Sequence, residues 1–132
     1  MSSYGKKFRN GWVSDALDLE GKYRVYMVAP FLPRMRFFLQ KKVFDKVQGH
    51  ITGYNEFLRF IRIARFRVEK GKSLSDAGLD VIRIVYDDPA NPFFVRPLVD
   101  EVRQIGPDEF LGQGMFTVLG KSVWAFWFLV RK

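Results

Sequence analysis

The sequence FLGQGMFTVLGKSVWAFWFLVR, residues 110–131, contains two strongly apolar segments separated by Gly120-Lys121. A short Gly-containing pair between two such segments is typical of a β-hairpin, so we predict strands over 110–119 and 122–131. The second segment is apolar on both of its faces, which is unusual for a strand with one side in water. We therefore expect this strand to be covered on both sides, as in a strongly curved or closed sheet.

Three more strands are predicted upstream of this hairpin. Residues 22–29 alternate in the way expected of a mostly buried strand, and residues 79–86 are rich in Val and Ile. Residues 93–105 read as one strand that bends around Pro97. The chain from residue 79 onward is thus predicted to be a meander of antiparallel strands.

A helix is predicted between the first strand and this meander, over residues 33–47. Pro33 suits the first helical position, and Gly49 suits the position after the end. Apolar residues recur at three- and four-residue steps and indicate one buried stripe, formed by Met35, Phe38, Leu39, Val43 and Val47. Residues 49–55 are then predicted to be a turn-rich connection.

Residues 57–69 fit two patterns. Read as a helix, the segment places Arg59, Arg62 and Arg65 at three-residue steps. Read as a strand, it places a set of mostly apolar side chains on one face, namely Leu58, Phe60, Ala64, Phe66 and Val68. The density of Phe, Ile and Val favours the strand.

Residues 18–26, DLEGKYRVY, resemble the start of the first strand in calycin barrels, the lipocalins and fatty-acid-binding proteins. In those families a short lead-in reaches Gly-x-Trp; here the motif is Gly21-Lys22-Tyr23, with Tyr in place of Trp. A helical insertion after the first strand is similar to the fatty-acid-binding branch, and a last strand that ends in a basic residue, Arg131, also fits. The resemblance implies a closed barrel whose apolar interior binds fatty acids or similar ligands.

Together these patterns predict one mainly antiparallel β (α+β) domain of 132 residues, with residues 1–20 as a loosely packed lead-in. The expected architecture is a strongly curved sheet or a small calycin-like barrel with one amphipathic helix in the N-terminal half. Aromatic residues make up 17% of the chain, so we expect either a very aromatic core or a cavity lined with Phe. With no Cys and one His, no metal site and no cofactor are expected.

Arg62 is the first candidate ligand-binding residue. On a strand over 57–69, alternation places Arg62 with Phe60 and Phe66 on the interior face and Arg65 on the exterior face. A single guanidinium in an apolar interior suits a carboxylate headgroup, because its fork donates two charge-assisted hydrogen bonds. The alternative is that Arg62 pairs with a carboxylate of the core or extends to an edge.

Arg83 and Arg103 are candidates for the same reason, since each lies between apolar or paired neighbours on its own strand face. Trp124 and Trp127, three residues apart on the last strand, are predicted to lie on opposite faces, so that one can line a cavity while the other packs outside. Asp100 and Glu101 are adjacent and therefore point to opposite faces, which argues against a catalytic carboxylate pair. No residues argue for a catalysed reaction.

The charge of the chain is concentrated in residues 34–72. This segment holds 11 Lys and Arg against three acidic residues, so its net charge of +8 equals that of the whole chain. We expect an anionic or amphiphilic partner.

The first hypothesis is a lipocalin-like protein that binds an amphipathic, anionic hydrophobic small molecule. The alternative is a peripheral protein that docks the basic, Phe-rich 34–72 segment on an anionic membrane or an acidic partner. Nucleic acid is disfavoured because no recognition motif is present. Without an apolar leader or a run of about 20 apolar residues, we expect a cytoplasmic location, with a membrane surface as the alternative.

Overall fold

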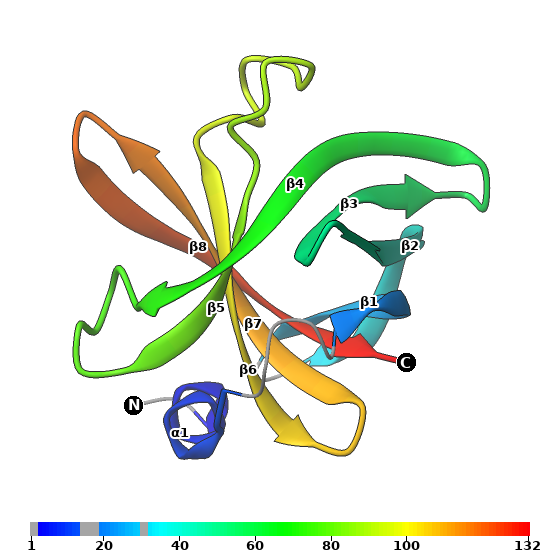
Figure 1. Cartoon of the computed structure of the whole chain (residues 1–132). Coiled ribbons are helices and arrows are strands. Elements are labelled where there is room, and N and C mark those ends of the chain that lie inside the picture. The colour runs from blue at the N-terminus through cyan, green and yellow to red at the C-terminus, as the bar shows by residue number, and fades with distance from the viewer. Residues whose placement is uncertain (1–2, 14–18, 30–31) are drawn as a thin grey trace.

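The computed structural model describes residues 3–13, 19–29 and 32–132. Within them the chain forms one short helix and eight strands (Figure 1). The elements are α1 (Ser3–Asn10), β1 (Gly21–Ala29), β2 (Leu32–Val47), β3 (His50–Phe57), β4 (Ile61–Lys72), β5 (Asp80–Val85), β6 (Leu98–Gly106), β7 (Glu109–Val118) and β8 (Lys121–Arg131).

The strands form a closed barrel in which each strand pairs antiparallel with the next one along the chain. β1 and β8 close the barrel, with Val25 opposite Val130. The predicted mainly antiparallel β class, the barrel and the C-terminal hairpin are thereby confirmed. An eight-stranded antiparallel barrel with one helix is compatible with a calycin-like fold.

The helix predicted over 33–47 is wrong, because Leu32–Val47 is the long strand β2. β2 forms backbone hydrogen bonds with β1 on one side and β3 on the other. These hydrogen bonds stabilise the strand even though the apolar residues are spaced as in a helix. The turn-rich connection predicted over 49–55 is also wrong. The turn is confined to Gln48 and Gly49, both at positive φ, and β3 begins at His50.

The strand predicted over 57–69 proves to be two elements. β3 ends at Phe57, a turn follows at 58–60, and β4 begins at Ile61. Leu58 and Arg59 have positive φ in this turn. Positive φ is usually marked by glycine, and residues 58–60 contain none, so the sequence did not indicate the turn. Likewise the strand predicted over 93–105 begins only at Leu98, because residues 93–97 form turns.

A chain of aromatic rings runs from one end of the barrel into its interior. Successive ring pairs lie 5.2–5.8 Å apart between centroids, in the order Phe110, Tyr23, Phe44, Phe66 and Tyr86. All five residues are at least 96% buried. The predicted aromatic core therefore exists, and Phe110, Tyr23 and Phe44 lie at the end of the barrel where β1 and β7 begin.

A second apolar cluster covers the outside of the barrel beneath α1. Phe8 of α1 is buried there among Val28, Val81, Leu111 and Leu129. In Figure 1 the helix lies against the barrel wall near β6 and β7. No helix in the described part of the chain is both long enough and apolar enough to cross a membrane.

Candidate functional site

The end of the barrel opposite Phe110, Tyr23 and Phe44 contains a cavity of about 310 Å³. Its walls come from the second halves of β1, β2, β3 and β8, the first residues of β4 and β6, and the 86–97 connection. The cavity therefore opens at the end where the β3–β4 and β5–β6 connections lie. Most of its lining is apolar: Val25, Met27, Phe57, Ile63, Ala64, Val95, Leu98, Phe126 and Phe128.

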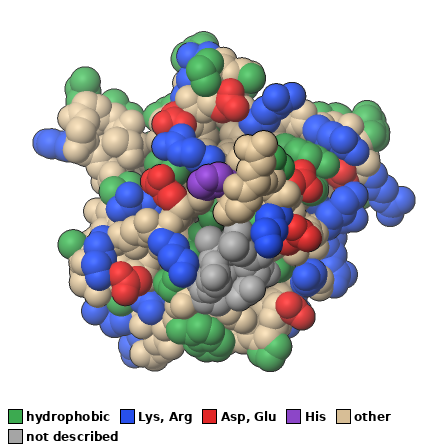
Figure 2. Space-filling model, in the orientation of Figure 1, with side chains coloured by type: hydrophobic (Ala, Val, Ile, Leu, Met, Phe, Trp, Pro, Cys, Tyr) green, Lys and Arg blue, Asp and Glu red, His purple; other side chains and the backbone are tan. Residues whose placement is uncertain are grey.

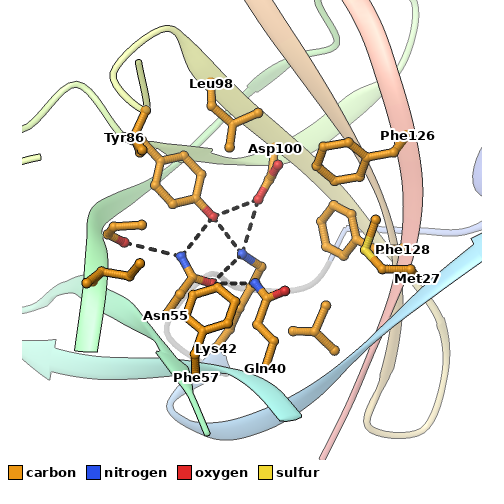
Figure 3. A pocket seen from close by; sticks show the side chains of 14 residues that line it. Met27, Gln40, Lys42, Asn55, Phe57, Tyr86, Leu98, Asp100, Phe126 and Phe128 are labelled. Carbon is orange, nitrogen blue, oxygen red and sulfur yellow. Dashed lines mark hydrogen bonds and ion pairs between the residues drawn. The ribbon is translucent and has the colours of Figure 1, made fainter. Parts of the chain in front are cut away.

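The floor of the cavity is polar. Four side chains from four elements meet there, and we call them the polar cluster: Lys42, Asn55, Tyr86 and Asp100. The Lys42 Nζ donates to Tyr86 Oη at 2.6 Å and to Asn55 Oδ1 at 2.9 Å, and it lies 3.2 Å from Asp100 Oδ2. Tyr86 Oη in turn donates to Asp100 Oδ2 at 2.7 Å. Figure 3 shows the amine at the centre of these groups, with Gln40 at the edge.

The barrel strands hold this cluster in place. Lys42 and Asn55 are direct cross-strand neighbours on β2 and β3. Asn55 also donates to the Ala64 carbonyl and accepts from Gln40 Nε2 at 3.0 Å, so its amide orientation is fixed. Asp100 Oδ1 is the exception, because this buried oxygen has no hydrogen-bond partner. A ligand that donates a hydrogen bond could satisfy it.

Burial controls the electrostatics of the cluster. Burial lowers the pKa of the Lys42 ammonium, while the neighbouring Asp100 carboxylate partly offsets this by favouring the charged form. Burial raises the pKa of the Tyr86 phenol well above its ordinary value, and the charge of Asp100 acts in the same direction. The rings of Phe66, Tyr86 and Phe128 also face the Lys42 amine at 5.3–5.7 Å.

Two glycines of β7 give the cavity its shape. A Cβ atom on Gly112 would lie 2.3 Å from the Phe128 ring, and one on Gly114 would lie 2.3 Å from the Phe126 ring. The far end of each ring therefore occupies the space above its cross-strand glycine, and both rings line the cavity. The space that remains is the cavity.

The predicted interior position of Arg62 is wrong. A bulge in β4 places two residues, Ala64 and Arg65, between Ile63 and Phe66 against one residue, Tyr54, on β3, and Ala64 adopts φ +57° there. The extra residue reverses the alternation, so Ile63 and Ala64 both line the cavity and Arg62 points outward. Its guanidinium lies 5.2 Å above the ring of Tyr54 on the outer surface.

A second bulge, in β8, determines the face on which the two tryptophans lie. Ala125 has no partner between the pairs Met115–Trp124 and Gly114–Phe126, so Trp124 and Trp127 share the outer face. Their ring centroids lie 6.1 Å apart, which contradicts the prediction of opposite faces. Trp127 packs on Phe8, and neither tryptophan lines the cavity.

The other predicted residues lie outside the cavity as well. Phe60 is 75% exposed in the β3–β4 turn. Arg83 lies on the outer face, where it donates to the Lys72 carbonyl and approaches Glu69. Arg103 is buried beneath α1 and donates to the Gly11 carbonyl at 2.7 Å. Phe66 is in the interior, where its ring packs against Tyr86 below the cavity.

Sequence reasoning missed the polar cluster. The helix predicted over 33–47 placed Lys42 with Lys41 among surface charges, whereas on a strand the two side chains point in opposite directions. The sequence could have indicated that Tyr86 and Asp100 point inward. Each lies two positions from a buried apolar residue, Ile84 and Val102 respectively, and residues two apart on a strand share a face. This spacing could have directed attention to Asp100 before the structure was known.

Comparisons with protein-family models, with curated proteins and with solved structures found no match for this chain. The described residues contain no group of three or more His, Asp or Glu side chains that could hold a metal ion.

Proposed function

We propose that this protein binds a small amphipathic molecule inside the barrel, in the manner of a lipocalin-like carrier. The observation that supports this most is the combination of an apolar cavity with one buried polar cluster at its floor. Pockets for small molecules have this composition: mostly apolar walls and a few polar groups that fix orientation. A volume of about 310 Å³ is at the lower end of such pockets, which favours a compact ligand over a long-chain lipid.

The cluster also indicates the polar group of the ligand. Lys42 is already paired with Asp100, so the cluster as a whole is close to neutral. An additional carboxylate would have to compete with Asp100 for the same ammonium. A carbonyl or hydroxyl oxygen could instead accept from Lys42, and a hydroxyl could also donate to the free Asp100 Oδ1. We therefore favour an uncharged polar group over the carboxylate expected from the sequence.

A ligand series of one chain length tests this proposal. Octanol, octanal and octanoic acid would each be used to displace an apolar fluorescent dye, with native mass spectrometry to count bound molecules. We expect the alcohol and the aldehyde to bind more tightly than the acid at neutral pH. A preference for the acid would overturn the choice of headgroup, and failure of all three would overturn the proposed function.

A cavity-filling variant provides the matched control. Leu98→Trp adds bulk at a residue that lines the cavity, whereas Leu74→Trp makes the same change at an exposed position on the outside. Binding should be lost in the first variant and retained in the second. Equal binding by both variants would show that the ligand lies elsewhere.

A second candidate function is docking of the open end on an anionic membrane. Large apolar side chains are exposed on connections at this end of the barrel, with Phe93 at 80% in the 86–97 connection and Leu119 at 97% in the β7–β8 turn. Exposed Arg96 lies in the 86–97 connection as well, and exposed Arg59 lies in the β3–β4 turn. In Figure 2 many Lys and Arg side chains gather on the side where Figure 1 shows the β3–β4 turn. Apolar side chains flanked by basic ones complement an anionic lipid surface.

Vesicle co-sedimentation tests this candidate. Binding should require acidic lipid and weaken as salt rises, because exposed charges are screened. Phe93→Ser should reduce binding, whereas Val47→Ser, at an exposed position at the other end of the barrel, should not. Binding that is indifferent to lipid charge, or equal loss in both variants, would eliminate docking through the mouth.

A further inference from the structure

We propose that Lys42 forms a covalent imine with an aldehyde or ketone held in the cavity. The inference rests on the proposed function, because the carbonyl compound must first occupy the apolar space above the polar cluster. It adds a reactive group and a substrate class to that site: small, mostly apolar carbonyl compounds.

The position of the amine is the first reason. Lys42 is the only lysine among the described residues that line the cavity. Its side chain is 97% buried, and nine of the other lining residues are apolar. A carbonyl carbon delivered by the apolar body of a ligand would therefore meet one amine. The chain contains no Cys that could compete as a thiol nucleophile.

The neighbours of the amine supply the proton transfers. Tyr86 Oη lies 2.6 Å from Lys42 Nζ, and Asp100 Oδ2 lies 3.2 Å from it. Asp100 Oδ1 has no partner, so this carboxylate has a free site to accept a proton from the ammonium. Burial lowers the pKa of Lys42 and thereby favours the same transfer.

The reaction balances without an additional reagent. Lys42 passes one proton to Asp100, and the neutral Nζ attacks the carbonyl carbon to form a C–N bond. The carbonyl oxygen gains protons from the ammonium so formed and from the Asp100 carboxyl group, with Tyr86 as the relay. The C–O bond then breaks, water leaves and a C=N bond remains as a protonated imine.

The product fits the site as well as the reactant does. The protonated imine carries one positive charge at the position of the former ammonium. Asp100 would be its counter-ion, so the number of buried charges is unchanged. The apolar walls restrict water, which slows the hydrolysis that would reverse the step.

Reductive trapping tests the proposal on the intact chain. The protein would be incubated with octanal and sodium cyanoborohydride at neutral pH, and its modified lysines identified by peptide mass spectrometry. We expect one octyl group on Lys42 and slower labelling of Lys41 and Lys46, because the cavity holds the aldehyde beside the Lys42 amine and burial lowers the pKa of that amine. Excess octanol should protect Lys42 and leave the other two unaffected.

Two variants separate a reactive role from a structural one. Lys42→Arg keeps a positive charge beside Asp100 but cannot form an imine, so the selective adduct should disappear. Lys41→Arg, one residue away on β2, should leave the adduct unchanged. If Lys42→Arg does not fold, protection of the wild-type Lys42 by octanol still decides the question.

The possible failures are distinguishable. Octanol binding without modification of Lys42 by octanal would overturn the imine and leave the proposed function standing. Modification spread evenly over the surface lysines, unaffected by octanol, would also overturn the imine. Failure of octanol and octanal to bind at all would overturn both proposals.

Discussion

The pairing of Lys42 with Asp100 predicts a large thermodynamic coupling between the two residues. Both side chains are 3% exposed, and 3.2 Å separates Nζ from Oδ2. In Asp100→Leu the ammonium would remain buried without a counter-charge, and in Lys42→Met the carboxylate would remain. We expect each single variant to be strongly destabilised and the double variant to recover much of the loss.

The magnitudes follow from these contacts. Removing one partner of a buried ion pair costs about 3–5 kcal/mol, so two independent substitutions would cost about 6–10 kcal/mol together. In the double variant no charge is left, and the main loss is the hydrogen bonding of Tyr86, which retains a 3.4 Å contact with Asn55 Nδ2. One weakened buried hydroxyl costs about 1–3 kcal/mol. The coupling free energy should therefore be about 3 kcal/mol or more.

Urea unfolding, followed by circular dichroism and Trp fluorescence, gives the free energy of unfolding for all four proteins of the cycle. Domains of this kind have a total free energy of unfolding of about 5–15 kcal/mol. A single variant that is unfolded in buffer, while the double variant is folded, would therefore also support the coupling. Additive losses, with the double variant as unstable as the sum of the singles, would refute it. That result would mean that the two charges do not compensate each other in the folded state.

Three further predictions concern other parts of the barrel. Gly114→Ala should push the Phe126 ring toward the cavity, cost about 1–3 kcal/mol of stability and weaken dye binding, measured by urea unfolding and fluorescence titration. Above about pH 10 the phenol of Tyr86 ionises in the unfolded state, whereas the raised pKa of this phenol in the folded state keeps it protonated. The free energy of unfolding of the wild type should therefore fall as the pH rises above about 10, and Tyr86→Phe should lack this contribution. Phe8→Ala should cost about 3–5 kcal/mol and shift the Trp127 emission to longer wavelength, because α1 would lose its buried contact.

Each of these predictions has a clear contrary result. Unchanged dye affinity in Gly114→Ala would show that the Phe126 ring can move without narrowing the cavity. Parallel stability curves for the wild type and Tyr86→Phe at alkaline pH would show that this phenol ionises as easily in the folded state as in the unfolded state. A marginal loss in Phe8→Ala, equal to that in exposed Phe93→Ala, would show that α1 does not stabilise the barrel.

Local pattern determined the class of this protein. The C-terminal hairpin and the strands at 22–29 and 79–86 could be predicted because β-alternation and turn residues act over a few positions. The apolar character of both faces of 122–131 correctly indicated cover on both sides for Phe128, Leu129 and Val130, whereas residues 121–124 are exposed. The aromatic content likewise indicated an aromatic core, which runs from one end of the barrel into its interior.

The site was decided by tertiary structure. β2 is a strand because two neighbouring strands complete its hydrogen bonds, and only as a strand does it turn Lys42 inward and Lys41 outward. The bulges at Ala64 and Ala125 reverse the alternation of β4 and β8, which removed Arg62 and Trp124 from the interior. A bulge depends on how two strands fit around a closed barrel, and no short stretch of sequence contains that information.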